Sequence, residues 1–340
     1  MSTVDDIKLA LRRSRKQAEE DLFTPRGILL FLGVVATLLV PLFAGPYLQG
    51  VVLQMYIFFL AVASWNFIAG YFGMFSFTHA ALFGIGGYAT AVSALELGVN
   101  PIVAIVIGGV AGGLFSLPIT IPALRLGGSY LAMVTLAYAE IIHLAAISFR
   151  DITGGPTGLT GFTAMFGGSR FQFFYFTVAV VGLFLAVQYV LTVSRFGLIA
   201  RAIRESEDAA QMLGNNTYRH KLAGFFVGSA LAGVAGGLQV YNVLIISPQM
   251  LQINQMIRFM AMTVIGGIGI FSGPIVGVVA VLGLSELLRG FTSIRLLIWG
   301  FLLLIIILFA PNGIMGSSVQ SDLLKEQANT VRNALRGDSK

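Results

Sequence analysis

Long apolar runs separated by short polar segments dominate this chain between residues 27 and 311. A run of about 20 apolar residues is long enough to cross a membrane as a helix. The pattern predicts about ten such helices, with the approximate bounds 27–45, 47–70, 76–96, 101–124, 128–147, 171–193, 220–243, 255–271, 273–290 and 293–311. We therefore expect an all-α polytopic membrane protein, in which only a short break at 269–274 separates the eighth and ninth runs.

The composition supports this fold class. Hydrophobic residues make up 56% of the 340 positions and charged residues only 11%, and the 69 residues between Arg26 and Glu96 include no Asp, Glu, Lys or Arg. Soluble globular proteins carry about 25% charged residues, so an ordinary soluble domain is excluded. The chain has no cysteine, which excludes a disulfide framework and a Cys-ligated metal, and we expect no metal site.

The distribution of basic residues predicts the orientation of the helices. An even number of spans returns both termini to one side of the membrane. If that side is the cytoplasm, 16 of the 21 Lys and Arg residues lie in inner segments and five in outer ones. Cytoplasmic segments carry such an excess, so both termini are predicted to be cytoplasmic. The net charge of +6 then reflects topology, and we expect membrane lipid rather than nucleic acid around the chain.

The predicted organisation has a cytoplasmic N-terminal tail (1–26), a transmembrane domain (27–311) and a cytoplasmic C-terminal tail (312–340). Two loops of the transmembrane domain are too long to be simple connectors, namely the outer loop 149–170 and the cytoplasmic loop 194–220. Loops of this length in a compact fold are usually functional or disordered.

The cytoplasmic loop carries the signature of a short helix. Ser206 is a suitable N-cap, Glu207 and Asp208 place negative charge in the first turn, and Gly214 suits a left-handed C-terminal position. A helix of barely two turns is only marginally stable alone in water. Its apolar stripe consists of Ala209, Met212 and Leu213. We expect this stripe to enter a groove on a partner, and the alternative is an ordinary loop with a chance cap.

Two glycine clusters suggest an internal repeat. Residues 84–87 read Gly-Ile-Gly-Gly in the third predicted span, and residues 266–269 read Gly-Gly-Ile-Gly in the eighth. Spans 2–5 and 7–10 would run in opposite senses, as an inverted repeat requires. Close helix packing by small residues explains the clusters equally well.

Few ionisable groups lie at membrane depth, where they are costly and are functional candidates by default. Glu140 and His143 are three residues apart on the fifth predicted helix, so they share a face and can meet. The pair either lines the path of a solute or makes a structural hydrogen bond. His79, at the start of the third span, is either a structural histidine or a substrate contact.

A recognisable motif lies in the cytoplasmic loop. The chain contains no G-x-x-x-x-G-K-[ST] phosphate-binding loop, so we do not expect it to hydrolyse a nucleotide by that route. The segment Asp208-Ala209-Ala210-x-x-x-Gly214 resembles the E-A-A-x-x-x-G coupling motif of ABC importer permeases, with Asp in place of Glu.

Further segments resemble the branched-chain amino acid permease family of the LivM type, in the order of that family. They are Gly70-Tyr71-Phe72-Gly73, His79-Ala80-Ala81-Leu82-Phe83-Gly84-Ile85-Gly86, Tyr130-Leu131-Ala132-Met133-Val134-Thr135-Leu136, Glu140-Ile141-Ile142, Thr153-Gly154-Gly155-Pro156, Ser194-Arg195-Phe196-Gly197, Arg201-Ala202-Ile203-Arg204-Glu205, Lys221-Leu222, Ile265-Gly266-Gly267-Ile268-Gly269, Gly273-Pro274 and Pro311-Asn312-Gly313.

This resemblance implies a type II-like importer permease with an inverted repeat in the bacterial inner membrane. It implies a heterodimer with a homologous second permease, two cytoplasmic ATPases that bind ATP and Mg, and a periplasmic or extracellular solute-binding protein, with no cofactor in this chain. The residues assigned to coupling with the ATPase are Glu205, Glu207, Asp208, Ala209, Ala210, Met212, Leu213 and Gly214. Candidates for docking the binding protein are Arg150, Asp151 and Arg170 in the outer loop.

The sequence departs from the family pattern at His143, where Arg is frequent, and at 75–78, which read Phe-Ser-Phe-Thr. The solute is therefore open: we expect branched-chain or other amino acids, with urea, short amides or small organic acids as alternatives. An ion-coupled secondary transporter is the alternative from a different class. An intramembrane enzyme using Glu140 and His143 is disfavoured, because no Ser/His/Asp or metal-ligand set has a credible spacing.

Overall fold

The computed structural model describes residue 33 and residues 36–125, 128–289 and 313–315. The predicted tails and the tenth predicted run, 293–311, lie outside these residues, apart from 313–315. The chain divides into two compact units, 1–259 and 260–340, which are described separately.

The described part of the first unit is almost entirely helical. Its long helices are α3 (Pro46–Asn66), α4 (His79–Glu96), α5 (Pro101–Ala123), α6 (Ser129–Ser148), α8 (Arg170–Val193) and α11 (Thr217–Val243). Its shorter helices are η1 (Phe67–Tyr71), α7 (Arg150–Thr153), η2 (Gly155–Thr157), η3 (Met165–Gly168), α9 (Arg195–Glu205), α10 (Glu207–Met212) and η4 (Pro248–Leu251). The strands β1 (Leu159–Thr160) and β2 (Ile245–Ile246) pair antiparallel.

Helices α4, α5 and α11 form the centre of this unit, and glycines bring their backbones together. A side chain at Gly86 of α4 would overlap the backbone of Gly233 of α11, and one at Gly233 would lie 2.5 Å from the carbonyl oxygen of Gly108 of α5. Small residues allow this approach where lipid supplies no hydrophobic force between helices. The close-packing interpretation of the first glycine cluster is confirmed, and the inverted repeat stays a prediction.

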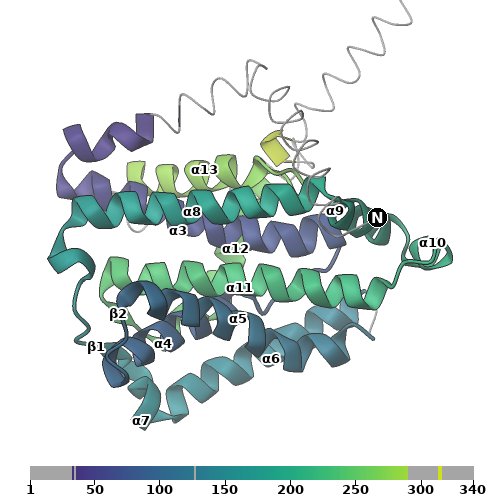
Figure 1. Cartoon of the computed structure of the whole chain (residues 1–340), viewed down its shortest axis with the longest axis horizontal. Coiled ribbons are helices and arrows are strands. Elements are labelled where there is room, and N and C mark those ends of the chain that lie inside the picture. Colours follow the sequence, from purple (N-terminus) through teal and green to yellow (C-terminus); the bar gives the residue numbers. More distant parts are fainter. Residues whose placement is uncertain (1–32, 34–35, 126–127, 290–312, 316–340) are drawn as a thin grey trace, which may run out of the picture. The chain divides into compact units, whose positions relative to one another are not determined.

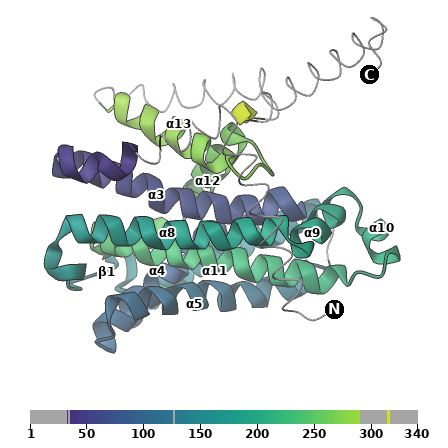
Figure 2. The same cartoon turned by 45° about the horizontal axis from the view of Figure 1, so that its top comes forward.

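Helices α3 and α8 pack together beside this centre. Gln188 of α8 donates a hydrogen bond to the carbonyl of Ala63 in α3 at 2.8 Å, and both residues are buried. Helices α3, α8 and α11 run along one direction in both views (Figure 1 and Figure 2). In the most apolar 18-residue window of each helix, the buried share is 78% in α11 but only 28% in α6 and 22% in α8. Within the described residues, much of the surface of α6 and α8 is thus left uncovered and suits contact with lipid or a partner.

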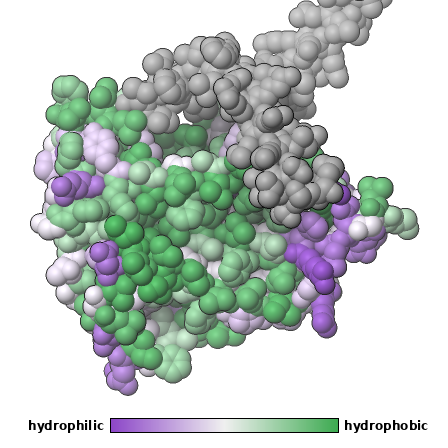
Figure 3. Space-filling view, viewed as in Figure 1, coloured by the Kyte–Doolittle hydropathy of each residue, from purple (hydrophilic) through white to green (hydrophobic). Residues whose placement is uncertain are grey.

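The two ends of the first unit differ in what they carry. Helices α9 and α10 lie at one end, and α7 lies with β1 and β2 at the other (Figure 1). The surface between these ends is mostly hydrophobic, and hydrophilic residues gather strongly at the α9–α10 end (Figure 3). This arrangement agrees with the predicted separation of the loops 149–170 and 194–220 onto opposite sides of a membrane.

Within the described residues, five helices are long and apolar enough to cross a membrane: Pro46–Tyr71, Pro101–Ala123, Tyr130–Ser148, Arg170–Val193 and Thr217–Val243. The prediction of about ten spans is not tested in full. The eighth predicted run, 255–271, overlaps α12 (Ile253–Gly266), which has 14 residues. A helix of that length rises about 21 Å and does not cross a hydrocarbon core of about 30 Å alone.

The second unit contains the end of α12 and α13 (Gly273–Leu287). The two helices approach closely, because a side chain at Gly277 would overlap the carbonyl oxygen of Met262. Helix α12 ends at Gly266, and Gly267 and Gly269 both take left-handed φ angles before α13 begins. The second glycine cluster therefore makes a turn, whereas the first lies inside a helix.

Candidate functional site

The short helix predicted in the cytoplasmic loop is present as α10, Glu207–Met212. The Ser206 hydroxyl oxygen caps it by accepting a hydrogen bond from the backbone N–H of Ala209 at 3.3 Å. Glu207 and Asp208 occupy the first turn, and Gly214 follows the helix with a φ of +80°. The predicted cap, acidic first turn and left-handed glycine are confirmed.

Helix α10 turns one side toward the protein and exposes the other. Ala210 is 1% exposed, whereas Met212 is 90% and Leu213 79% exposed. Ala209 and Asp208 are also exposed. The predicted apolar stripe of Ala209, Met212 and Leu213 therefore lies on the surface, and nothing in the described part of the chain covers it.

Polar contacts hold α10 to the start of α11. The Glu207 carboxylate forms an ion pair with the Lys221 ammonium. The Gln211 amide donates a hydrogen bond to the Thr217 hydroxyl at 2.9 Å. Glu205, at the end of α9, pairs instead with its neighbour Arg204 at 3.1 Å. Glu205 and Glu207 thus make internal contacts, and the exposed Asp208 and the apolar stripe are available to a partner.

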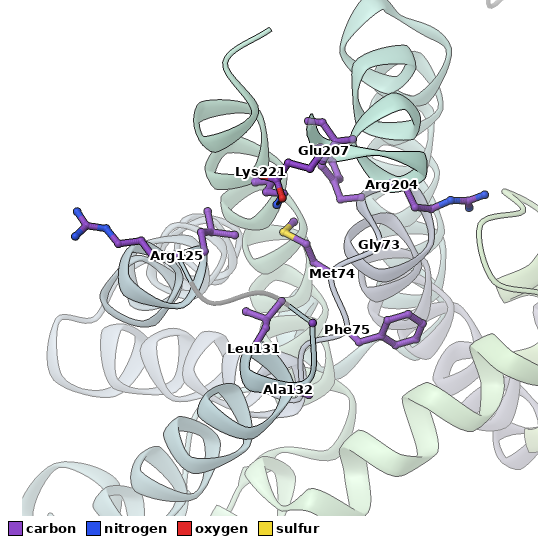
Figure 4. Close-up of a pocket in the computed structure, with 13 residues that line it drawn as sticks. Gly73, Met74, Phe75, Arg125, Leu131, Ala132, Arg204, Glu207 and Lys221 are labelled. Atoms are coloured by element: carbon purple, nitrogen blue, oxygen red, sulfur yellow. Dashed lines mark hydrogen bonds and ion pairs between the residues drawn. The ribbon is translucent and has the colours of Figure 1, made fainter. Parts of the chain in front are cut away.

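A pocket of about 650 Å³ lies beside α9 and α10. It is lined by the apolar residues Phe72, Met74, Phe75, Leu131 and Ile203 and by the charged residues Arg125, Arg204, Glu207 and Lys221, among others. Figure 4 shows the Met74 side chain reaching into it, whereas the guanidinium groups of Arg125 and Arg204 extend away from it. The pocket therefore presents an apolar interior with an ion pair at its edge.

Sequence analysis did not predict this pocket as a site. Phe72 and Gly73 belong to a segment that resembles the family, and Phe75 belongs to the departure at 75–78, but no sequence feature singles out Met74. The pocket forms where these residues, the segment 124–132 and helix α9 come together in space. Helical periodicity describes one helix at a time, so it does not predict such a contact between distant segments.

The predicted pair on α6 is formed. Glu140 Oε1 lies 3.2 Å from His143 Nδ1. The Glu140 side chain is 53% exposed and the His143 side chain 11%. His143 Nε2 is buried without a hydrogen-bond partner among the described residues. The pair thus lies at the surface of the first unit, with the carboxylate outward, and its role in a solute path stays a prediction.

His79 opens α4 and has no exposed surface. Its Nε2 atom lies 2.7 Å from the hydroxyl oxygen of Ser64 in α3. This contact supports the structural interpretation of His79, because a solute has no access to the side chain in this conformation. Contact with substrate stays a prediction.

The three candidates in the outer loop are exposed at the end of the unit opposite α10. Arg150 and Asp151 lie in α7, and Arg170 is the first residue of α8. The loop between them is fixed at one point by the pairing of Leu159 with Ile246. The exposed charges of Arg150, Asp151 and Arg170 therefore flank a loop that is held in place by this strand pairing.

Within the described residues, no group of three or more His, Cys, Asp or Glu side chains could hold a metal ion.

Comparison with known proteins identifies related chains. The family described as branched-chain amino acid transport system, permease component, matches residues 47–311. The high-affinity branched-chain amino acid transport system permease protein LivM of Escherichia coli is 27% identical over 278 residues, covering 74% of this chain and 65% of the relative. The probable LivM permease of Methanocaldococcus jannaschii is 26% identical over 272 residues, covering 68% of this chain and 77% of the relative.

The high-affinity permease protein LivH of Escherichia coli is 35% identical over 143 residues, covering 39% of this chain and 43% of the relative. The chain spans 65% of the length of the Escherichia coli LivM protein, just under two thirds. No solved structure matches the chain.

The family match covers most of the chain and includes all five candidate membrane helices except the first residue of the first one. The chain is therefore a multi-pass membrane protein and belongs to the branched-chain amino acid transport permease family.

Proposed function

We propose that this chain is a permease subunit of an ATP-driven ABC importer in the bacterial inner membrane. With a homologous second permease it forms the membrane path for a small polar solute, a branched-chain or related amino acid. Two cytoplasmic subunits bind ATP and Mg and hydrolyse the nucleotide, and a solute-binding protein delivers the solute on the outer side. The relatives named as LivM and LivH permease proteins support a paired assembly.

The exposed stripe on α10 is the observation that carries this proposal. Met212 and Leu213 are 90% and 79% exposed at the tip of a loop that is otherwise anchored to the protein. Large apolar side chains gathered at one exposed place indicate an interaction site. An apolar helical face that enters a groove on a partner is a recurring recognition mode, and the partner here is the ATPase.

The anchoring of α10 explains how the partner can act on the membrane helices. The ion pair from Glu207 to Lys221 and the hydrogen bond from Gln211 to Thr217 connect α10 to α11. Because α11 lies at the centre of the first unit, a displacement of α10 reaches the glycine-packed core. Closure of the ATPases on ATP then moves the two permeases as rigid bodies and opens the path to the other side.

The exposed face of α6 suits a surface that lines the path or meets the second permease. A charged side chain at membrane depth facing lipid costs about 2.5–3.5 kcal/mol on insertion scales. Glu140 is 53% exposed on that face and is paired with His143. Contact with the second permease or with a hydrated path removes this cost, and the small number of fixed charges suits a zwitterionic solute.

Purification of the intact complex tests the proposal. The chain should elute with a second permease and two nucleotide-binding subunits, and the solute carried by the binding protein identifies the substrate. The double variant Asp208→Lys, Leu213→Glu should lose the ATPases and keep the second permease. Asp151→Lys is the control for the first substitution, because it makes the same charge change as Asp208→Lys at the opposite end of the unit and should keep the ATPases. Full retention of the ATPases by the double variant contradicts docking at α10.

A further inference from the structure

Helix α3 does not end as an ordinary α-helix. Its last turn continues as the π-helix η1, Phe67–Tyr71, and all five residues are buried. Single π turns are rare and occur frequently at functional sites. The last carbonyls of a helix lack partners within the helix, so the buried end of η1 needs donors from elsewhere.

Arg204 of α9 supplies one of these donors. Its Nη1 atom donates a hydrogen bond to the carbonyl oxygen of Gly70 at 2.7 Å, across 134 residues of sequence. The backbone that follows η1 also lies against this side chain. A Cβ atom at Gly73, whose φ is +72°, would lie 2.9 Å from Arg204 Cγ.

Aromatic contacts join the rest of α9 to the same turn. The Phe196 ring stacks on Phe67 with centroids 6.4 Å apart and meets Phe72 edge-on at 5.6 Å. The Arg201 guanidinium lies 5.8 Å from the centre of the Tyr71 ring. Helix α9 and η1 thus form one packed body, and only Ser206 separates α9 from α10.

The segment 72–75 that follows η1 forms a wall of the pocket beside α9. Phe72, Gly73, Met74 and Phe75 line this pocket together with Ile203 and Arg204 of α9. Figure 4 shows Met74 and Phe75 on the wall that Gly73 begins, next to Arg204. A movement of η1 with α9 therefore changes the shape of this pocket.

We propose that Arg204 is a positioning residue that makes η1 and the segment 72–75 follow α9 when the ATPase displaces α10. This inference rests on the proposed function and adds the route by which α10 acts on α3. If α9 moved alone, the Gly70 carbonyl would lose this charged donor at a partly buried position, and with it part of the free energy of a charge-assisted hydrogen bond. The linked movement of α9 and η1 keeps the bond, so it is favoured.

Labelling of a single cysteine in this chain, measured on its own gel band after the complete complex is labelled, tests the link. The chain has no native cysteine, and Phe75 is 45% exposed, so Phe75→Cys gives one reporter on the pocket wall. We expect the maleimide labelling rate to change on the order of tenfold on addition of a non-hydrolysable ATP analogue, the usual size of a coupling between sites. The change should be lost in Arg204→Gln, whose neutral amide ends two atoms short of the guanidinium nitrogen that bonds Gly70. It should be partly restored in Arg204→Lys, which keeps a charged N–H donor on a longer side chain. Arg195→Gln, on the exposed side of the same helix, should respond as the parent does.

A distance measurement makes the test independent of how the Arg204 variants fold. Spin labels at Phe75→Cys and Leu198→Cys report on the pocket wall and on α9, and Leu97→Cys reports on the other end of α4. The 75–198 distance should stay constant on nucleotide binding while the 75–97 distance changes.

The outcomes separate the two proposals. A chain that does not retain the ATPases contradicts the proposed function. A Phe75→Cys parent that retains them but does not respond to nucleotide overturns the linked movement of α9 and the segment 72–75. With the ATPases retained and a responsive parent, an unchanged response in Arg204→Gln overturns the positioning role and leaves Arg204 a static contact. A 75–198 distance that changes with nucleotide overturns it as well.

Discussion

Truncation of Leu213 to alanine isolates the contribution of the exposed stripe to binding of the ATPase. Leu213 is the C-cap of α10, and its backbone N–H donates to the carbonyl of Ala209 at 3.2 Å. Its side chain is 79% exposed and makes no contact on which the fold depends. Leu213→Ala therefore removes apolar surface without disturbing α10.

The magnitude follows from the buried area. Full burial of a leucine side chain contributes about 1.5–3 kcal/mol. Alanine retains only the Cβ atom, so the variant should weaken binding of the ATPase by about 2 kcal/mol, or roughly 30-fold. The stability of the membrane helices should change by no more than about 0.5 kcal/mol, as is usual for surface substitutions.

Titration of the purified ATPase onto the permease pair held in lipid nanodiscs measures this effect. Leu198→Ala is the matched control, because Leu198 is 49% exposed on the neighbouring helix α9 but lies outside the stripe. The reasoning is refuted if Leu213→Ala binds as the parent does, or if Leu198→Ala weakens binding by as much.

Three further substitutions test other parts of the structure. Glu140→Gln removes the charge at membrane depth and should lower uptake by roughly tenfold, the scale of one charge-assisted hydrogen bond, without loss of the ATPase; unchanged uptake leaves this residue a structural role only. Gly236→Ala should lower the free energy of unfolding in detergent by about 1–3 kcal/mol, because its new methyl group would overlap the backbone of α4. Gly182→Ala, with open space around it, should be neutral or stabilising by about 0.5–1 kcal/mol, and equal effects of the two would contradict the packing account. Ser206→Ala should lower the stability of α10 by about 1 kcal/mol and weaken binding of the ATPase by roughly fivefold. Ser206→Asp should restore the binding, because Asp is also a good N-cap. An alanine variant that binds the ATPase normally shows that the cap does not matter for binding.

Local features of the structure could be predicted from local sequence. The cap at Ser206 and the left-handed Gly214 defined α10 within one residue, because capping depends on atoms three or four positions away. The contact between Glu140 and His143 follows in the same way from helical spacing. The five candidate spans could be located from long apolar runs, because the length of such a run is also a property of local sequence.

Features that join distant segments could not be predicted. The π turn at Phe67–Tyr71 falls within a run that is uniformly apolar, so periodicity gives no sign of it. The bond from Arg204 to Gly70 spans 134 residues and depends on how α9 packs. The glycines at 84–87 and 266–269 look alike in sequence, yet the first group packs inside a helix and the second turns the chain, because tertiary context decides between these uses.

Transport by the reconstituted proteins tests the central claim most directly. Proteoliposomes that contain both permeases and both ATPases should accumulate the solute only when ATP and the solute-binding protein are supplied. Liposomes that contain the two permeases alone should accumulate nothing under a proton or sodium gradient. Gradient-driven uptake without the ATPases would show a secondary transporter and contradict the account.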